Sequence, residues 1–289
     1  MSRALTRRLF RLSENITLKY IEKRGENMGF EIIDFHAHPF AEPSENICRH
    51  KEYCGLTSEN TPEYLKKMGI SHICGSVLDK NREFPEGTTL WERLSYSNRT
   101  ALALAEKYGG FYTPGIHVHP RYIRESCEEI EKMSKLGVKL IGELVPYMDD
   151  WSDYSCREFD EILDAALAYN MIVSFHTIDN DQIDAMVKKH PKNVFVAAHP
   201  GEYENAVRHF ERMKMSENYY LDLSGTGLFR LGVLRHGIDV CGSERFLFGT
   251  DYPVCSPAVN LGELLLNPLY SDAERENIFS KNAKRLLGI

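Results

Sequence analysis

Short apolar runs alternate along this chain with longer segments in which apolar residues recur at helical spacing. Eight runs are apolar and rich in β-forming residues, which predicts buried strands of a parallel sheet. The predicted strands are Glu31–His38, Ile70–Leu78, Phe111–His119, Val138–Val145, Met171–Thr177, Asn193–His199, Tyr219–Ser224 and Phe246–Asp251. Between and after these runs lie amphipathic stretches that predict helices. The clearest are Leu90–Tyr108, Arg121–Leu136, Cys156–Tyr169, Asp179–His190, Glu202–Met213, Leu228–Val240 and Asp272–Leu287.

Eight strands that alternate with helices predict the α/β class and closure into a (β/α)₈ TIM barrel. No linker or low-complexity segment interrupts residues 29–289, so we expect one domain there. Residues 1–28 form a separate N-terminal extension, in which residues 1–24 are predicted to be an extra helix. Its role is open: it could pack on the barrel or on a second subunit, act in targeting, or precede a natural start at Met28.

Composition and charge narrow the setting in which the protein works. No apolar run reaches the ~20 residues needed to cross a bilayer, and no secretory signal is present, so we expect no membrane association. The seven cysteines are scattered, which is typical of reduced thiols in a cytoplasmic protein. The net charge is −7, and because residues 1–28 carry +4 the remainder carries −11, so no nucleic-acid partner is expected. The sequence is compatible with a homo-oligomer.

Polar residues stand where six of the predicted strands end, although a buried strand should stay apolar. In a (β/α)₈ barrel the carboxyl ends of all strands meet on one face, where active sites lie. Residues distant in sequence therefore become neighbours there. The polar residues at the ends are Asp34, His36, His38, His117, His119, Glu143, His176, His199 and Asp251.

His36 and His38 are two residues apart on a strand, so both side chains point to the same face. Two imidazoles on one face can chelate a divalent ion, and imidazole suits zinc, iron, nickel or copper; zinc (Zn²⁺) is the ion we expect. Carboxylates in the same set also admit manganese (Mn²⁺). A His-x-His pair followed by strand-end Glu, His, His and Asp predicts a site for one or two metal ions.

The pattern resembles the amidohydrolase superfamily, and within it the amidohydrolase-related (amidohydrolase 2) branch of hydrolases and non-oxidative decarboxylases. The resemblance extends over roughly residues 30–289 and is strongest at the motifs around the metal. Its motifs are Asp34-Phe35-His36-Ala37-His38-Pro39, His176, His199, Thr250-Asp251-Tyr252-Pro253 and the closing Asn282-Ala283-Lys284-Arg285-Leu286.

The resemblance implies a role for each of these positions. His36 and His38 would bind the more buried metal, and Asp251 would bind it and take a proton from the bound water. In two-metal members His176 and His199 hold the second ion. In one-metal members His176 often joins the first ion, and His199 contacts substrate or water.

The fourth strand departs from the commonest pattern of the family. Many two-metal members carry a carboxylated lysine there, whereas this chain has Glu143, as TatD-type deoxyribonucleases do. Lys139 lies deeper on the same strand face. We favour Glu143 as a bridging ligand, and the alternative is that it only hydrogen-bonds substrate or a loop.

These features predict a metal-dependent hydrolase of a small-molecule amide, ester or lactone. A decarboxylase of the same branch is the main alternative, and a TatD-like nuclease is disfavoured by the −11 charge. The alternative that is not an enzyme is a barrel that binds a ligand without catalysis. Asp251 and His199 are the predicted catalytic residues. The predicted substrate-binding residues are His117, His119, Tyr147, Trp151 and Arg230.

Overall fold

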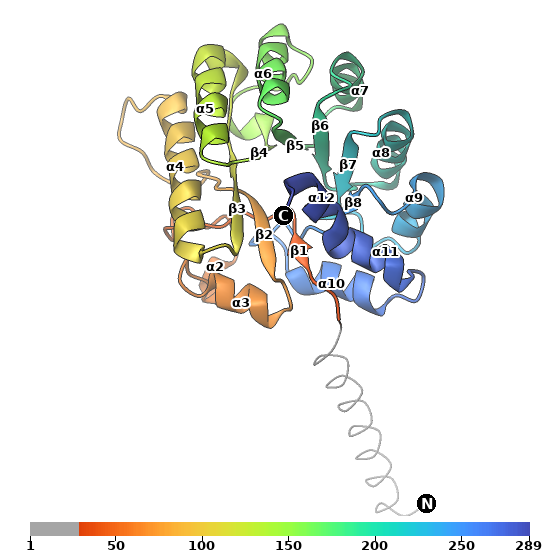
Figure 1. Ribbon diagram of the computed structural model, residues 1–289. Coiled ribbons are helices and arrows are strands. Elements are labelled where there is room, and N and C mark those ends of the chain that lie inside the picture. Colours follow the sequence, from red (N-terminus) through yellow and green to blue (C-terminus); the bar gives the residue numbers. More distant parts are fainter. Residues whose placement is uncertain (1–28) are drawn as a thin grey trace, which may run out of the picture. The chain divides into compact units, whose positions relative to one another are not determined.

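The computed structural model describes residues 29–289, and the predicted N-terminal helix lies outside them. Eight strands pair in parallel in the order of the sequence, from β1 to β8 (Figure 1). They are β1 (Ile33–Asp34), β2 (His72–Ser76), β3 (Tyr112–Ile116), β4 (Leu140–Leu144), β5 (Ile172–His176), β6 (Val194–Ala198), β7 (Tyr219–Asp222) and β8 (Phe246–Leu247).

The last strand returns to the first and nearly closes the barrel. Phe35 donates its backbone N–H to the carbonyl of Phe248 at 2.8 Å, and Ala37 forms a parallel bridge with Tyr252. The predicted (β/α)₈ barrel is therefore confirmed, with every predicted strand in place. This closure also brings the segment after β1 against the segment after β8.

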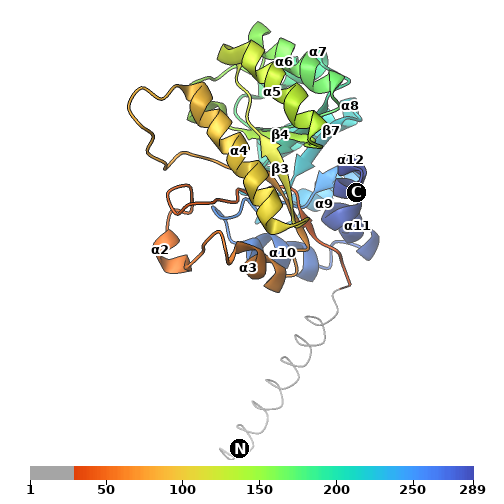
Figure 2. The ribbon, with the colours of Figure 1, turned by 60° about the vertical axis from the view of Figure 1, so that its left-hand side comes forward.

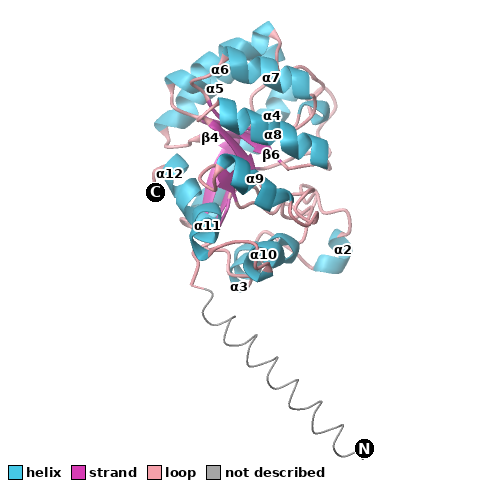
Figure 3. Cartoon of the chain, turned by 90° about the vertical axis from the view of Figure 1, so that its right-hand side faces the viewer, coloured by secondary structure: helices cyan, strands magenta, loops and turns pink. Residues whose placement is uncertain are grey.

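Helices surround the strands on the outside of the barrel (Figure 3). They are α2 (Lys51–Cys54), α3 (Thr61–Lys67), α4 (Leu90–Tyr108), α5 (Ile123–Lys135), α6 (Arg157–Ala168), α7 (Asn180–Lys189), α8 (Tyr203–Met215), α9 (Val233–Cys241), α10 (Pro257–Leu266), α11 (Asp272–Glu276) and α12 (Asn282–Leu287). A π-helical turn, Asn277–Lys281, joins α11 to α12. Within residues 29–289, no helix combines the length and the apolarity needed to span a bilayer.

Helix α4 illustrates how local sequence sets these boundaries. Thr89 and Glu92 form a capping box at its start, and Gly109 ends it in the left-handed conformation. Leu94, Ala101 and Leu104 recur on one face and are buried. Burying that stripe against the strands stabilises the helix in place.

The core fills the barrel and continues into α12, which covers the amino-terminal ends of the strands. Ile33, Leu140 and Ile172 pack with Ala283 and Leu287 in one buried cluster. Figure 1 shows α12 near the middle of the ring of strands. This end is closed by apolar packing, so the opposite end, where the strands finish, is left for polar chemistry.

Candidate metal centre

Four donor atoms from three parts of the chain converge at the carboxyl ends of the strands. The Nε2 atoms of His36 and His38 lie 3.1 Å apart, and each is 3.4 Å from Oε2 of Glu143. Oδ1 of Asp251 lies 3.8 Å from the first nitrogen and 3.7 Å from the second. The His-x-His pair, the fourth-strand glutamate and the eighth-strand aspartate are therefore brought together, over a separation of more than 200 residues in sequence.

The spacing of these four donors fits a single divalent ion. Donors that share one zinc ion at about 2.0–2.2 Å in a tetrahedron lie about 3.3–3.6 Å from one another. His36, His38 and Glu143 form one of the donor groups compact enough to hold an ion. Imidazole nitrogens and carboxylate oxygens are also the donors that zinc and manganese accept.

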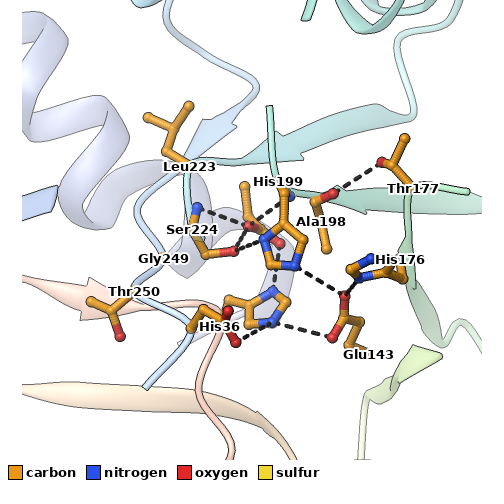
Figure 4. Close-up of polar contacts among 12 residues, drawn as sticks. His36, Glu143, His176, Thr177, Ala198, His199, Leu223, Ser224, Gly249 and Thr250 are labelled. Atoms are coloured by element: carbon orange, nitrogen blue, oxygen red, sulfur yellow. Dashed lines mark hydrogen bonds and ion pairs between the residues drawn. The ribbon is translucent and has the colours of Figure 1, made fainter. Parts of the chain in front are cut away.

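Glu143 joins this group to a second one. Its other oxygen, Oε1, lies 2.7 Å from Nδ1 of His176 and 3.5 Å from Nε2 of His199 (Figure 4). Glu143, His176 and His199 form another donor group of the right size for an ion. Each oxygen of one carboxylate thus faces its own pair of histidines. That is the arrangement a bridging ligand between two ions requires.

Lys139 lies at the other end of the barrel and takes no part in the cluster. Its Nζ donates to the carbonyl of Leu287 at 2.5 Å, which ties β4 to the end of α12. A carboxylated lysine at this position could not reach the histidines. The carboxylate available to bridge them from the fourth strand is Glu143.

The backbone turns sharply at two of the donor residues. His199 and Asp251 have φ values of 69° and 63°, in the left-handed region that few residues other than glycine adopt. Asp251 is held there by its N–H, which donates to the carbonyl of His36 at 2.9 Å. Strained backbone of this kind is concentrated at functional sites, where the surrounding fold holds it.

Strand β4 is irregular where it presents Glu143. The register with β5 shifts between Ile141 and Leu144, a bulge-like feature that re-aims a side chain. Gly142 has φ +91°, and a Cβ there would lie 2.1 Å from the carbonyl oxygen of Ser174. Only glycine fits beside β5 at this point, so Gly142 is required for the placement of Glu143.

Replacing Gly142 with alanine is expected to lower the free energy of unfolding by about 2–5 kcal/mol, because it adds overpacking to a disfavoured φ. Urea denaturation measures the change. Gly262→Ala in α10 is the matched control, since a Cβ there meets nothing within 4 Å. That control should be neutral or slightly stabilising. Equal stability of the two variants would show that the backbone at Gly142 relaxes freely.

Hydrogen bonds fix which nitrogen of each first-strand histidine is free. Nδ1 of His38 lies 3.0 Å from the carbonyl oxygen of Ser76, and a carbonyl can only accept, so Nδ1 carries the proton. Nδ1 of His36 lies 2.9 Å from Oδ2 of Asp222 and donates to it. In the neutral rings both Nε2 lone pairs then face each other across 3.1 Å, which calls for a cation between them.

The electrostatics of the cluster also favour a cation. Burial lowers the pKa of His36, but the charges of Asp222 and Glu143 outweigh it and raise that pKa well above its usual value. Burial raises the pKa of Glu143, yet His36 and His176 outweigh it and hold that pKa well below the usual range. A metal ion at His36 would compete with a proton for the same ring nitrogen.

A cavity of about 870 Å³ opens above the donors. His38, Glu143, His176, His199 and Asp251 line its floor. Tyr147 is an exposed residue at its wall, and its ring lies edge-on to that of His176, with the ring centroids 5.4 Å apart. The loop before α2 and the loop between β2 and α4 complete the wall, and Figure 2 shows both on the same side of the molecule.

The structure places three other sequence-predicted residues away from this cavity. His117 is buried, with Nε2 donating to the carbonyl of Val77 at 2.8 Å. Nε2 of His119 donates to the carbonyl of Asp149 at 2.7 Å, and its ring packs against Trp151. Trp151 and His119 line a separate hollow.

Arg230 also lies outside the cavity above the donors. It pairs with Glu202 and lines another surface hollow together with Tyr203 and His236. Of the five residues predicted to contact substrate, Tyr147 is the one that lines the cavity above the donors.

Sequence reasoning missed Asp222, the last residue of β7. It is fully buried and accepts a hydrogen bond from His36, and its contacts reach His199 through Ser224. The signal was present, because Asp222 and Ser224 are polar residues at the end of a buried run, like the others. Asp222 was missed because it belongs to no recognised metal-ligand spacing.

Comparisons with known proteins extend these observations. A search of curated protein sequences finds no match to the chain. The fold matches a 2,6-dihydroxybenzoate decarboxylase from Rhizobium with 15% identity, over 90% of this chain and 99% of that one, at a TM-score of 0.68. It also matches a probable 2-pyrone-4,6-dicarboxylic acid hydrolase from Acinetobacter baumannii, with 13% identity, 90% and 100% coverage and a TM-score of 0.62.

A third similar structure is a 5-carboxyvanillate decarboxylase from Novosphingobium aromaticivorans with bound manganese. The identity is 14%, the coverage is 91% of this chain and 98% of that one, and the TM-score is 0.62. At such identities these likenesses establish the fold alone. A family model described as amidohydrolase matches residues 33–289, which is most of the chain. The chain therefore belongs to the amidohydrolase family.

Proposed function

We propose that this protein is a hydrolase with two divalent ions that cleaves a small-molecule amide, ester or lactone. The observation that carries the proposal is the position of Glu143, whose two oxygens face separate histidine pairs. A glutamate that bridges two ions supports hydrolysis. A single ion with a free glutamate would support the alternative chemistry of the family.

The proposed ligands divide into two sets that share Glu143. His36, His38 and Asp251 would hold one ion, and His176 and His199 the other. Bound there, a divalent ion would lower the pKa of a water molecule and polarise the scissile carbonyl. Zinc is the proposed metal because imidazoles dominate the set, and manganese is the alternative. The manganese in the similar decarboxylase structure supports keeping that alternative.

Asp251 is the proposed general base. Its side chain is 13% exposed, and it lines both the large cavity and the smaller one that adjoins it at His176 and His199. A carboxylate at that position can accept a proton from the attacking water and pass it to the leaving group. His199 also lines both cavities, where it would orient the substrate.

The wall of the large cavity supports a substrate that carries an anionic group. Arg49, Lys51 and Lys80 line it, and its acidic residues are the metal-site pair Glu143 and Asp251. No acidic side chain pairs with Arg49 or Lys80 within residues 29–289. On an otherwise acidic barrel, this cationic wall would attract a carboxylate. Tyr147 offers an apolar ring on the same wall.

The same cationic wall is the observation that favours a second candidate, a non-oxidative decarboxylase, whose substrate must carry a carboxylate. Two of the similar structures are decarboxylases, which supports keeping this candidate. In that case a single ion would suffice and Glu143 would remain free.

We also propose that residues 29–289 are the catalytic domain, that the substrate is a small molecule and that the enzyme works in the cytoplasm.

Metal analysis and product analysis together test the proposed function. The chain is stripped with a chelator, reloaded with Zn²⁺ or Mn²⁺, and its ions are located by anomalous scattering. We expect an ion in each donor set, no turnover in the stripped protein, and recovery on reloading. A panel of lactones, esters and amides with a free carboxylate should yield hydrolysis products. Release of carbon dioxide by a chain holding one ion would overturn the proposal in favour of the decarboxylase.

A further inference from the structure

Asp222 lies beneath both donor sets and contacts a histidine of each. It is fully buried at the end of β7. Its Oδ2 accepts from Nδ1 of His36 at 2.9 Å. Its Oδ1 accepts from the backbone N–H of Ser224 at 3.0 Å and from the Ser224 hydroxyl. The hydroxyl in turn lies 2.9 Å from Nδ1 of His199.

The donors and acceptors in this series of hydrogen bonds show which ring nitrogen of His36 and of His199 carries the proton. A carboxylate only accepts, so His36 donates from Nδ1. The Ser224 hydroxyl has one hydrogen and gives it to Asp222, so towards His199 it must accept. Nδ1 of His199 therefore carries the proton, and its Nε2 is left with a lone pair. In both rings the free nitrogen is the one that faces Glu143.

We infer that Asp222 is the positioning residue for both proposed metal centres, acting directly on His36 and through the Ser224 hydroxyl on His199. This inference rests on the proposed two-ion site. Asp222 does not act on His38, because the backbone carbonyl of Ser76 sets the tautomer of that ring. The outer partners of metal-bound histidines fix the tautomer and ring orientation, and losing one typically costs 10–100-fold in metal affinity.

Geometry near Ser224 supports a role in seating His199. A Cβ built on Gly225, which has φ +59°, would lie 2.4 Å from Nδ1 of His199. The loop after β7 therefore approaches the imidazole closely, with the hydroxyl on one side and bare glycine backbone beside it. Figure 4 shows Ser224 next to the His199 imidazole. His36 lies on one side of that ring, and Thr177 and Ala198 lie on the other.

Asp222→Asn separates this inference from a merely structural role. An amide has one accepting and one donating end, so it can serve only one of its two partners. If its NH₂ faces His36, that ring must accept at Nδ1 and carries its proton on Nε2. If its NH₂ faces Ser224, it opposes the backbone N–H of Ser224, and the hydroxyl turns to donate to His199, so that ring inverts. Either way one histidine presents a proton where a ligand lone pair is needed.

The test measures zinc affinity and stoichiometry by equilibrium dialysis on the full chain. We expect Asp222→Asn to weaken at least one centre by about 10–100-fold. Ser224→Ala should weaken only the centre of His176 and His199. Ser97→Ala is the matched control, because Ser97 is a buried serine outside the cluster whose hydroxyl has no partner among residues 29–289. Unchanged zinc binding in both Asp222→Asn and Ser224→Ala would overturn the inference.

Imidazole ¹⁵N spectra of the metal-free protein give a second measurement that does not depend on activity or on metal. At about pH 9, well above the ordinary imidazole pKa of about 6.5, the tautomer of His199 can be observed. We expect the proton on Nδ1 in the unmodified chain and on Nε2 in Ser224→Ala. The same tautomer in both proteins would contradict the assignment. If the unmodified chain binds one ion only, the proposed function fails while this tautomer result remains interpretable.

Discussion

Glu143→Gln is expected to lose metal from both centres and to reduce turnover by at least about 10³-fold. One carboxylate supplies a donor oxygen to each histidine pair, at 3.4 Å on one side and 2.7–3.5 Å on the other. An amide is uncharged, and its NH₂ end would face lone pairs that need a cation. Removing a donor shared by two ions weakens both at once. Metal content by mass spectrometry and kcat with the best substrate check the expectation together.

Glu129→Gln is the matched control for that variant. Glu129 is also buried, but it lies on α5 and pairs with Lys132, away from the donor cluster. The Glu129→Gln variant should keep the metal content and the activity of the unmodified chain. If Glu143→Gln instead keeps one ion at His36 and His38 and retains its rate, Glu143 is not a bridge. The decarboxylase would then become the better reading.

Asp251→Asn is expected to keep the fold and to lower kcat by several orders of magnitude, with a smaller change in KM. General base catalysis contributes about 10²–10⁴-fold, and here the same side chain also lies within ligand distance of His36 and His38. The fold should survive because the backbone N–H of Asp251, which holds the turn against His36, is kept. Kinetics at saturating metal and circular dichroism measure the two effects.

The exposed Asp239 in α9 provides the comparison, since Asp239→Asn changes the same functional group far from the cavity. That variant should turn over at the rate of the unmodified chain. A near-normal kcat in Asp251→Asn, at full metal occupancy, would contradict the proposed role of Asp251 as base and leave the proton transfer to another group.

Much of the barrel could be predicted because its signals are local. Alternation of apolar runs with amphipathic stretches defines strands and helices without any knowledge of their partners. The predicted helix Leu90–Tyr108 matches α4 because its two ends have local sequence signals: a capping box at the start and a C-cap glycine at the end. Strand ends were harder to predict: β1 comprises only Ile33–Asp34, so His36 and His38 lie beyond its ladder. Ladder length depends on neighbouring strands.

Two His-x-His pairs show what only the tertiary structure decided. His36-Ala37-His38 and His117-Val118-His119 have the same local spacing, and both follow barrel strands. The first pair faces Glu143 and Asp251, whereas each histidine of the second pair gives a ring hydrogen to a nearby carbonyl. Spacing sets which face of a strand a side chain occupies. It does not set which groups stand opposite.

The sequence by itself determined the fold class and the chemical types of the donors that gather at the barrel mouth. Tertiary structure decided that one carboxylate faces two histidine pairs, that Trp151 and Arg230 lie elsewhere, and that Asp222 lies beneath the cluster. The physical reason is that hydrophobic periodicity is a property of neighbouring residues. The contacts of a metal cluster depend instead on strand register and closure, which join residues from opposite ends of the chain.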